Sequence, residues 1–321
     1  MKKVTALILA AIMMAMTFTG CGSDNQAAGD DVYRIGICQL VQHDALDAAT
    51  KGFQDALTEK LGDKVTFDVQ NASGDSQTCA TIANQFVSSD VDLILANATA
   101  SLQASSAATN TIPILGTSIT DYATALEIDD WNGTTGVNIS GTSDLAPLNE
   151  QAAMINELFP DAEKVGLIYC SAEPNSSYQA NIVKAELESL GYTCTEYTFA
   201  DSNDIAAVTT TAAAESDVIY IPTDNTAASA TEVINNVCLP AGIPVVAGEE
   251  GICKGCGVAT LSINYYDIGY KAGEMAYEIL VNGKDVSEMP IAFSETTTKK
   301  YNAAQCEALG ITVPEDYVAI D

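Results

Sequence analysis

The residues best suited to chemistry follow the strands that the hydrophobic pattern predicts. They occupy six short polar segments, at residues 39–44, 97–101, 117–121, 171–177, 223–225 and 248–250. These segments carry hydroxyls, amides and a few acids, but no Lys or Arg. In open parallel sheets, ligands bind beyond the carboxyl ends of the strands. The sequence therefore predicts a polar binding site without fixed cations.

This composition suits a ligand that carries both charges. Hydroxyls and the free backbone N–H groups at helix starts bind a carboxylate, while an acid such as Asp224 binds an ammonium group. We therefore expect a zwitterion, that is, an amino acid. Structural roles compete with this interpretation. Asp224 and Asn225 could cap the following helix, Ser176 could cap another, and His43 could be a surface loop residue.

The absence of common catalytic motifs argues against an enzyme. The chain has a single histidine and lacks G-x-S-x-G, a lysine-containing phosphate loop and H-E-x-x-H. Glu249 and Glu250 form an acid pair, but adjacent side chains tend to point apart. Cys253 and Cys256 form a C-x-x-C pair, which favours a local disulfide or two free thiols over half of a metal site, because no second pair completes a zinc set. We expect no metal and no cofactor.

Strand and helix patterns alternate along the chain and repeat after about 130 residues. Ser89-Asp90-Val91 corresponds to Ser216-Asp217-Val218, and Ile112-Pro113-Ile114 corresponds to Ile243-Pro244-Val245. Strands are predicted at 34–38, 66–70, 92–96, 113–116, 165–170, 193–198, 218–222 and 244–247. The predicted fold is α/β, with two similar doubly wound parallel-sheet lobes joined by a multi-segment hinge.

A further helix, predicted over 266–282, follows the last strands of the second lobe but could return to pack on the first. The connections between lobes are then expected near 137–141, 262–265 and 291–293, a hinge that closes around a ligand. The predicted boundaries are 32–140 plus 265–290 for lobe 1, and 141–264 plus 291–321 for lobe 2. Another helix is predicted over 144–159.

The N-terminus is typical of an exported lipoprotein. Two lysines precede an apolar run over 4–18, which predicts a signal peptide at residues 1–20. The junction Gly20-Cys21 resembles a lipobox, so we expect lipidation at Cys21, followed by a flexible tether at 21–31. Removing the two signal-peptide lysines takes the formal charge from -30 to -32. Such an acidic chain is not expected to bind nucleic acid.

Three segments together resemble a known family from about Tyr33 to the C-terminus. They are Gly36-Ile37-Cys38-Gln39-Leu40-Val41-Gln42-His43-Asp44-Ala45-Leu46-Asp47, Glu173-Pro174-Asn175-Ser176 and Ile221-Pro222-Thr223-Asp224-Asn225-Thr226-Ala227-Ala228-Ser229. They are similar to the solute-binding lipoproteins of tryptophan/tyrosine-type ABC importers. The chain departs from that family at Gln42, where a small hydroxyl residue is commoner.

The resemblance implies a type I periplasmic-binding fold and an aromatic amino acid as ligand. By the same resemblance, Asp224 binds the α-ammonium and the loop around Gln42 and His43 covers the ring. Thr99, Ser101, Asn175 and Ser176 are candidates for the carboxylate, and Thr117, Asn225 and Glu249 complete the predicted site.

The expected function is delivery of an amino acid to an ABC permease and ATPase. We expect a monomer that is extracytoplasmic and lipid-anchored to the bacterial cell membrane. The alternatives are the same fold binding another amino acid, a sugar or a nucleoside, or acting as a surface adhesin or sensor.

Overall fold

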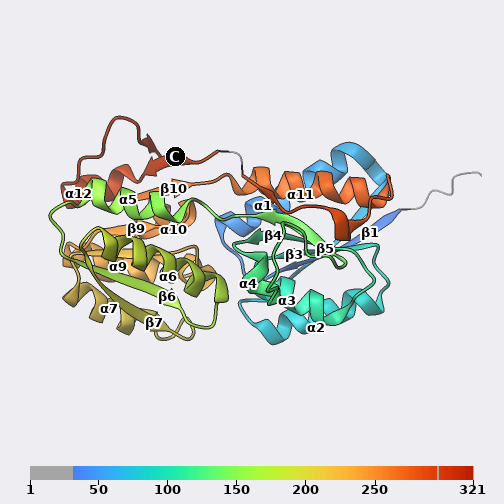
Figure 1. Ribbon diagram of the computed structural model, residues 1–321, viewed down its shortest axis with the longest axis horizontal. Coiled ribbons are helices and arrows are strands. Elements are labelled where there is room, and N and C mark those ends of the chain that lie inside the picture. Colours follow the sequence, from blue (N-terminus) through green and yellow to red (C-terminus); the bar gives the residue numbers. More distant parts are fainter. Residues whose placement is uncertain (1–31, 295, 321) are drawn as a thin grey trace, which may run out of the picture. The chain divides into compact units, whose positions relative to one another are not determined.

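The computed structural model describes residues 32–294 and 296–320, so the predicted signal peptide, Cys21 and the tether lie outside the described residues. Two β-sheets, each covered by helices, form two lobes within residues 32–320 (Figure 1). This is the predicted fold class.

The first sheet has six strands in the order β11-β5-β4-β3-β1-β2, and all neighbours pair parallel. Its strands are β1 Tyr33–Gln39, β2 Val65–Asn71, β3 Leu93–Asn97, β4 Ile114–Ile119, β5 Ile139–Ser143 and β11 Ala292–Phe293. Strands β1, β3 and β4 read as apolar runs because helices cover both faces of the sheet. Helices α1 (Asp44–Leu61), α2 (Ser76–Ser88), α3 (Thr99–Ala108) and α4 (Tyr122–Leu126) belong to this lobe.

The second sheet repeats this order as β7-β6-β8-β9-β10 and adds β12 and β13 beyond β10. Only β12 runs antiparallel to its neighbour β10. The strands are β6 Lys164–Cys170, β7 Thr193–Phe199, β8 Val218–Ile221, β9 Val245–Ala247, β10 Ala259–Ser262, β12 Thr298–Tyr301 and β13 Val318–Ala319. The helices here are α5 Leu148–Leu158, α6 Pro174–Ser189, α7 Ile205–Glu215, α8 Asn225–Ala228, α9 Thr231–Ala241, α10 Glu250–Cys256 and α12 Ala303–Leu309.

Helix α11 (Tyr265–Leu280) returns to the first lobe and packs along α1, as predicted (Figure 1). Glycine allows the two backbones to touch. A Cβ on Gly269 would clash with the carbonyl oxygen of Ala49, and one on Gly52 would clash with that of Tyr266. Two short 3₁₀ turns, Gly62–Lys64 and Val286–Glu288, complete the lobe.

The chain crosses between the sheets three times, at residues slightly different from those expected. Residues 137–141 and 291–293 were expected to connect the lobes, but β5 and β11 pair with each other in the first sheet. The crossings are therefore 144–147, 263–264 and the stretch between β11 and β12. The first sheet accordingly extends past the predicted boundaries at 140 and 290. Helix α5 starts at Leu148 rather than at residue 144, because 144–147 forms the crossing and Pro147 is the N-cap residue.

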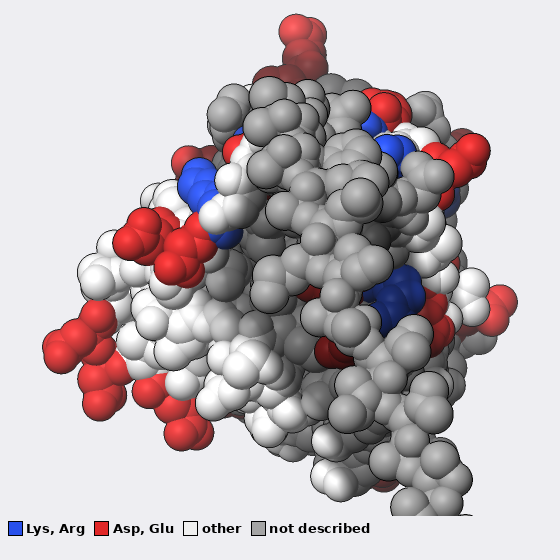
Figure 2. Space-filling view, turned by 90° about the vertical axis from the view of Figure 1, so that its right-hand side faces the viewer, with Lys and Arg blue, Asp and Glu red and all other residues white. Residues whose placement is uncertain are grey.

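The chain is acidic, with a formal net charge of -30. On the face drawn in Figure 2, Asp and Glu side chains project at several places around the rim and basic side chains are fewer. Among the helices of the described residues, none has the length and apolarity to cross a membrane.

Candidate functional site

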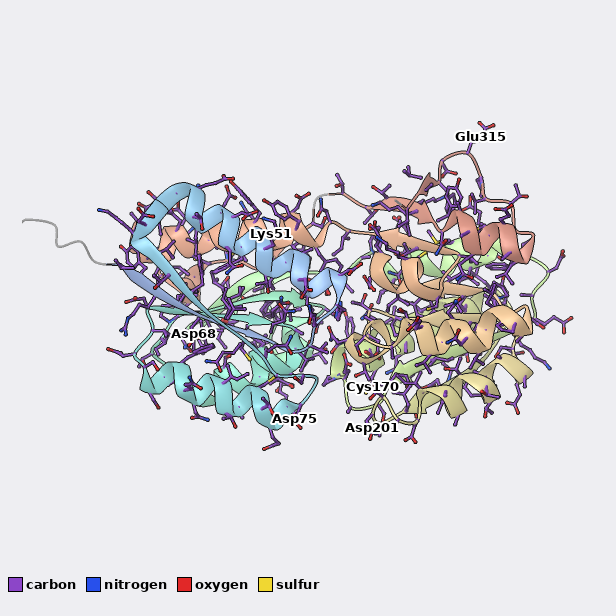
Figure 3. All side chains as sticks on the ribbon, turned by 180° about the vertical axis from the view of Figure 1, so that it is seen from behind. Lys51, Asp68, Asp75, Cys170, Asp201 and Glu315 are labelled. Atoms are coloured by element: carbon purple, nitrogen blue, oxygen red, sulfur yellow. The ribbon has the colours of Figure 1, made fainter. Side chains whose placement is uncertain are left out.

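The two lobes meet at the carboxyl ends of their strands through pairs of polar side chains. His43, at the start of α1, places Nε2 3.3 Å from Oδ1 of Asn225, at the start of α8. Gln179 of α6 donates a 3.4 Å hydrogen bond to the hydroxyl of Thr120, which follows β4. Figure 3 shows Cys170, the last residue of β6, on the side of its lobe that faces the other lobe. This edge is where the sequence predicted the ligand.

Glu173 organises the second lobe's part of this edge. Its carboxylate accepts hydrogen bonds from the backbone N–H groups of Asn225 and Thr226, at 3.0 and 2.9 Å, and from the side chains of both residues, each at 2.7 Å. Asn175 donates to the same carboxylate at 3.3 Å. Glu173 thereby fixes the start of α8 and the Asn225 amide that meets His43.

Asp224 is a helix cap, which was the structural alternative for this residue. One carboxylate oxygen accepts the backbone N–H of Ala227 at 2.8 Å and the other accepts that of Cys170 at 2.6 Å. The side chain is 1% exposed, and burial, together with the nearby charge of Glu173, raises its pKa. Ser176 donates to the carbonyl oxygen of Thr223 at 3.4 Å. Asp224 and Ser176 therefore lie close together, and each is fixed by hydrogen bonds to backbone groups.

The first lobe presents two strained residues at the same edge. Ala98, the N-cap of α3, has φ 85°, and Ser118 at the end of β4 has φ 57°. The N–H of Ala98 bonds the carbonyl of Thr117 at 3.1 Å, so the two strained turns are neighbours. The Ser118 hydroxyl is buried and has no hydrogen-bond partner among the described residues. Strained backbone and unpaired buried polar groups occur most often at functional sites. The two observations therefore favour the start of α3, where Thr99 lies, as part of the binding site.

Two further buried acids, Asp144 and Glu249, lie near the crossings between the lobes. Asp144 accepts hydrogen bonds of 3.0 Å from the hydroxyls of both Thr120 and Tyr265. Glu249 caps α10 by accepting the backbone N–H groups of Gly251 and Ile252. Burial raises the pKa of Asp144, and it raises the pKa of Glu249 to about 7 despite these backbone bonds.

Four buried carboxyl groups, those of Asp144, Glu173, Asp224 and Glu249, therefore lie at the facing edges of the lobes and at the crossing. None of them joins an ion pair within residues 32–294 and 296–320. Burying carboxylates without cationic partners is costly, and their hydrogen bonds offset only part of that cost. The arrangement favours a ligand that brings a positive charge.

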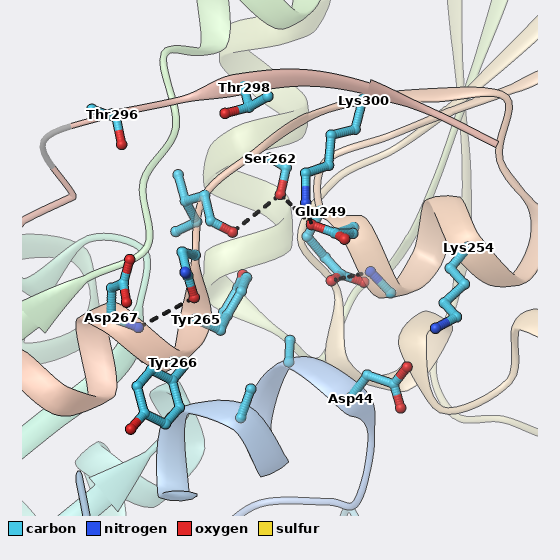
Figure 4. Close-up of a pocket in the computed structure, with 16 residues that line it drawn as sticks. Asp44, Glu249, Lys254, Ser262, Tyr265, Tyr266, Asp267, Thr296, Thr298 and Lys300 are labelled. Atoms are coloured by element: carbon cyan, nitrogen blue, oxygen red, sulfur yellow. Dashed lines mark hydrogen bonds and ion pairs between the residues drawn. The ribbon is translucent and has the colours of Figure 1, made fainter. Parts of the chain in front are cut away.

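A cavity of about 460 Å³ is lined by Glu249 and by Tyr265, the partner of Asp144 (Figure 4). It lies between the start of α1, represented by Asp44, and α10, represented by Glu249 and Lys254. Glu250, Ser262 and Lys300 also line the cavity. The Ser262 hydroxyl and the Lys300 ammonium each donate a 2.7 Å hydrogen bond to Oε2 of Glu250. The volume of the cavity is within the range of small-molecule pockets.

Three predicted site residues make no hydrogen bond to the other lobe among the described residues. Gln42 is exposed and lines a hollow at the carboxyl ends of β1 and β2. The hydroxyl of Ser101 lies 3.5 Å from each of the buried thiols of Cys38 and Cys79, so it points into the core. Thr117 accepts a hydrogen bond from Thr142 at 3.1 Å inside the sheet. The direction of each side chain depends on the face of the strand or helix that carries it. The position of a residue shortly after a strand does not determine that direction.

Sequence reasoning placed Glu173 within a family motif but not in the site, and it did not single out Asp144 or Tyr265. Glu173 directly precedes a proline that starts a helix, which is a usable signal for a side chain at a helix start. Asp144 directly follows β5, whose sequence predicts a connection between the lobes, so the sequence does not show that Asp144 lies at a strand end. Nothing in the sequence around Tyr265 indicates its partner 121 residues earlier.

Cys253 and Cys256 are both free and buried within α10. Within the described ranges, no group of three or more His, Cys, Asp or Glu side chains is arranged to hold a metal ion.

The sequence profile of one protein family, described as ABC transporter substrate binding protein, matches residues 34–320. The chain belongs to this family. A substrate-binding protein of this family is extracytoplasmic and works with a permease and an ATPase. The two parallel-sheet lobes are those of type I periplasmic-binding proteins, a fold shared with a glucose-galactose binding protein from Geobacillus stearothermophilus at 14% identity and a TM-score of 0.58 over 84% of this chain and 96% of that one.

Closer relatives of this substrate-binding protein are known by sequence and structure. The Tyrosine-binding protein of Clostridioides difficile (strain R20291) is 35% identical over 96% of this chain and 92% of its own. The ABC domain from Streptococcus pneumonia in complex with L-Trp is 31% identical, with a TM-score of 0.84 over 88% of this chain and 96% of that one.

A further solved structure, from Clostridium difficile, is the ligand-free, open structure of a substrate-binding protein with adhesive properties. It is 36% identical but matches with a TM-score of only 0.69, over 90% of this chain and 99% of that one. The more identical protein is thus the less similar in shape. The hydrogen bonds between His43 and Asn225 and between Gln179 and Thr120 agree with this comparison, so the described lobes are closed on each other.

Proposed function

We propose that this substrate-binding protein binds a free aromatic amino acid between its lobes and delivers it to its permease. The observation that carries the proposal is the set of four buried carboxyl groups without cationic partners at the facing edges and the crossing. An α-ammonium group supplies the missing cation. The names of the relatives, a tyrosine-binding protein and a complex with L-Trp, support an aromatic side chain.

The start of α3 is our candidate for the ligand's carboxylate. A helix start offers free backbone N–H groups and a partial positive charge, and Thr99 and Ser118 add hydroxyls there. Asn175 and Ser176 are second-lobe candidates for the same group. Asp224, Asn225 and Glu249, with Asp144 added, are candidates for the ammonium side. Most of the net affinity is expected from burial of the ring, at about 25 cal/mol per Å² of apolar surface.

A thermal-shift panel on ligand-stripped protein tests the proposal. The panel consists of the twenty amino acids, several sugars and several nucleosides. L-Trp, L-Tyr or L-Phe at about 100 times the dissociation constant should stabilise the folded form by about 2.7 kcal/mol and raise Tm by several degrees. A shift with a sugar or nucleoside, and none with any aromatic amino acid, would sink the assignment.

The protein is proposed to act as a monomer anchored to the cell membrane through lipid on Cys21, without catalytic activity of its own. Two acyl chains suffice for stable anchoring.

Adhesion is a second candidate function, because the 36% identical relative is described as having adhesive properties. Binding of the purified protein to host-cell surfaces, compared in the presence and absence of L-Tyr, tests it separately from transport.

A further inference from the structure

The ring of His43 lies at the contact between the lobes with only one of its nitrogens paired. Its Nε2 is 3.3 Å from Oδ1 of Asn225 across the interface. Its Nδ1 is buried and has no hydrogen-bond partner in the part of the chain that the structure describes. His43 is also the N-cap residue of α1, yet its side chain makes no capping bond. The free nitrogen is therefore not explained by helix capping.

The hydrogen bonds of Asn225 determine which nitrogen carries the proton. Its Nδ2 donates to Oε2 of Glu173 at 2.7 Å, so its Oδ1 is the atom that faces His43. A carbonyl oxygen can only accept, which makes Nε2 of His43 the donor. Desolvation by burial lowers the pKa of His43, which keeps the ring neutral. In a neutral ring with a proton on Nε2, Nδ1 holds a lone pair.

Glu173 and Asn225 thus hold His43 as a hydrogen-bond acceptor that lacks a donor. The α-ammonium is not the natural occupant, because a cation prefers the carboxylates of the same cleft to a neutral nitrogen. A neutral donor on the ligand's side chain fits instead. An indole offers an N–H, a phenol offers an O–H, and a plain phenyl ring offers neither.

We propose that Nδ1 of His43 accepts a hydrogen bond from the ring N–H of tryptophan or the ring O–H of tyrosine, and so distinguishes both from phenylalanine. The proposal rests on the proposed binding of an aromatic amino acid. A ligand without the donor leaves the buried acceptor unpaired when the lobes close, and a site built to hydrogen-bond a substrate group discriminates strongly against the analogue that lacks it.

Titration calorimetry with the full-length mature protein tests the proposal. We expect L-Tyr or L-Trp to bind at least about tenfold more tightly than L-Phe, and O-methyl-L-tyrosine and 1-methyl-L-tryptophan to bind more weakly than their parent amino acids. In His43→Phe, which removes the acceptor and keeps an aromatic ring, the preference should shrink to within about threefold. Gln85→Ala, on an exposed residue of α2, is the control and should keep the preference.

Two results would overturn the proposal while the proposed function stands. One is a Tyr-to-Phe preference that His43→Phe leaves unchanged, and the other is an equal loss of affinity for all three amino acids. If no aromatic amino acid binds the wild-type protein, the proposed function itself has failed.

Nitrogen NMR of ¹⁵N-histidine-labelled, tag-free protein gives a readout that needs no variant. His43 is the only histidine of the chain, so a single imidazole is observed. The Nε2–H tautomer is expected throughout, and the Nδ1 resonance should shift with L-Tyr or L-Trp but much less with L-Phe. An identical response to L-Tyr and L-Phe, or a proton on Nδ1, contradicts the proposal.

Discussion

The hydroxyl of Tyr265 donates a 3.0 Å hydrogen bond to the carboxylate of Asp144, 121 residues earlier in the chain. Asp144 opens the first crossing between the lobes, and Tyr265 directly follows the second. Asp144 also accepts the hydroxyl of Thr120. Two crossings and the end of β4 are thus joined at one buried carboxyl group.

Tyr265→Phe should lower the free energy of unfolding by about 1–3 kcal/mol, because it leaves a buried carboxyl group with one bond fewer. Urea denaturation at neutral pH measures the change. Tyr266→Phe is the matched control, since its half-buried hydroxyl bonds Asp55 on the first lobe and the loss should be below about 1 kcal/mol. An equal decrease in the free energy of unfolding for the two variants would show that the hydrogen bond to Asp144 stabilises the protein no more than the hydrogen bond to Asp55.

Asp224→Ala should lower both stability and ligand affinity. The substitution leaves the N–H groups of Cys170 and Ala227 unpaired, and loss of a helix cap alone costs about 1 kcal/mol. Loss of an ammonium partner costs about 2–5 kcal/mol, a factor on the order of 30 or more in affinity. Calorimetry and thermal unfolding separate the two effects. Reduced stability with unchanged affinity would leave Asp224 as a cap only.

Ligand binding near neutral pH should release protons. The pKa of Glu249 is raised to about 7, and that of Asp224 is raised by burial, so both acids are partly protonated there. A bound ammonium favours their charged forms and lowers these pKa values. Affinity should therefore rise as pH rises toward about 7 and then level off, because at higher pH both acids are already charged in the ligand-free protein.

Calorimetry with L-Tyr in phosphate and in Tris at pH 7 measures the released protons, because the two buffers differ in ionisation enthalpy. Glu249→Gln, which keeps an acceptor for the α10 cap, should reduce the difference. Identical binding enthalpies in the two buffers would mean that the ammonium does not approach these acids.

Cys21→Ser should abolish membrane anchoring. The Gly20-Cys21 junction is the basis of this prediction, and the wild-type protein should partition into the detergent phase of Triton X-114 whereas the variant should not. A variant that still enters the detergent phase at the same processed mass would refute the anchor.

Much of the fold could be predicted from the sequence because its signals are local. All eight predicted strands are present within a few residues, since buried parallel strands read as short apolar runs bounded by turns. The return of α11 to the first lobe was also predicted. The predicted crossings were less accurate. The two-residue strand β11 is a strand only through its pairing with β5, which lies about 150 residues earlier in the chain.

The sequence by itself determined that two similar lobes would gather hydroxyls, amides and acids without cations at facing sheet edges, because strand ends are fixed by local pattern. Only the tertiary structure decided which of these residues meet. It turned Ser101 into the core and Gln42 outward, set Asp224 as a cap, and brought His43 against Asn225, 182 residues away. Side-chain direction and long-range partners depend on packing between elements, and no local spacing encodes them.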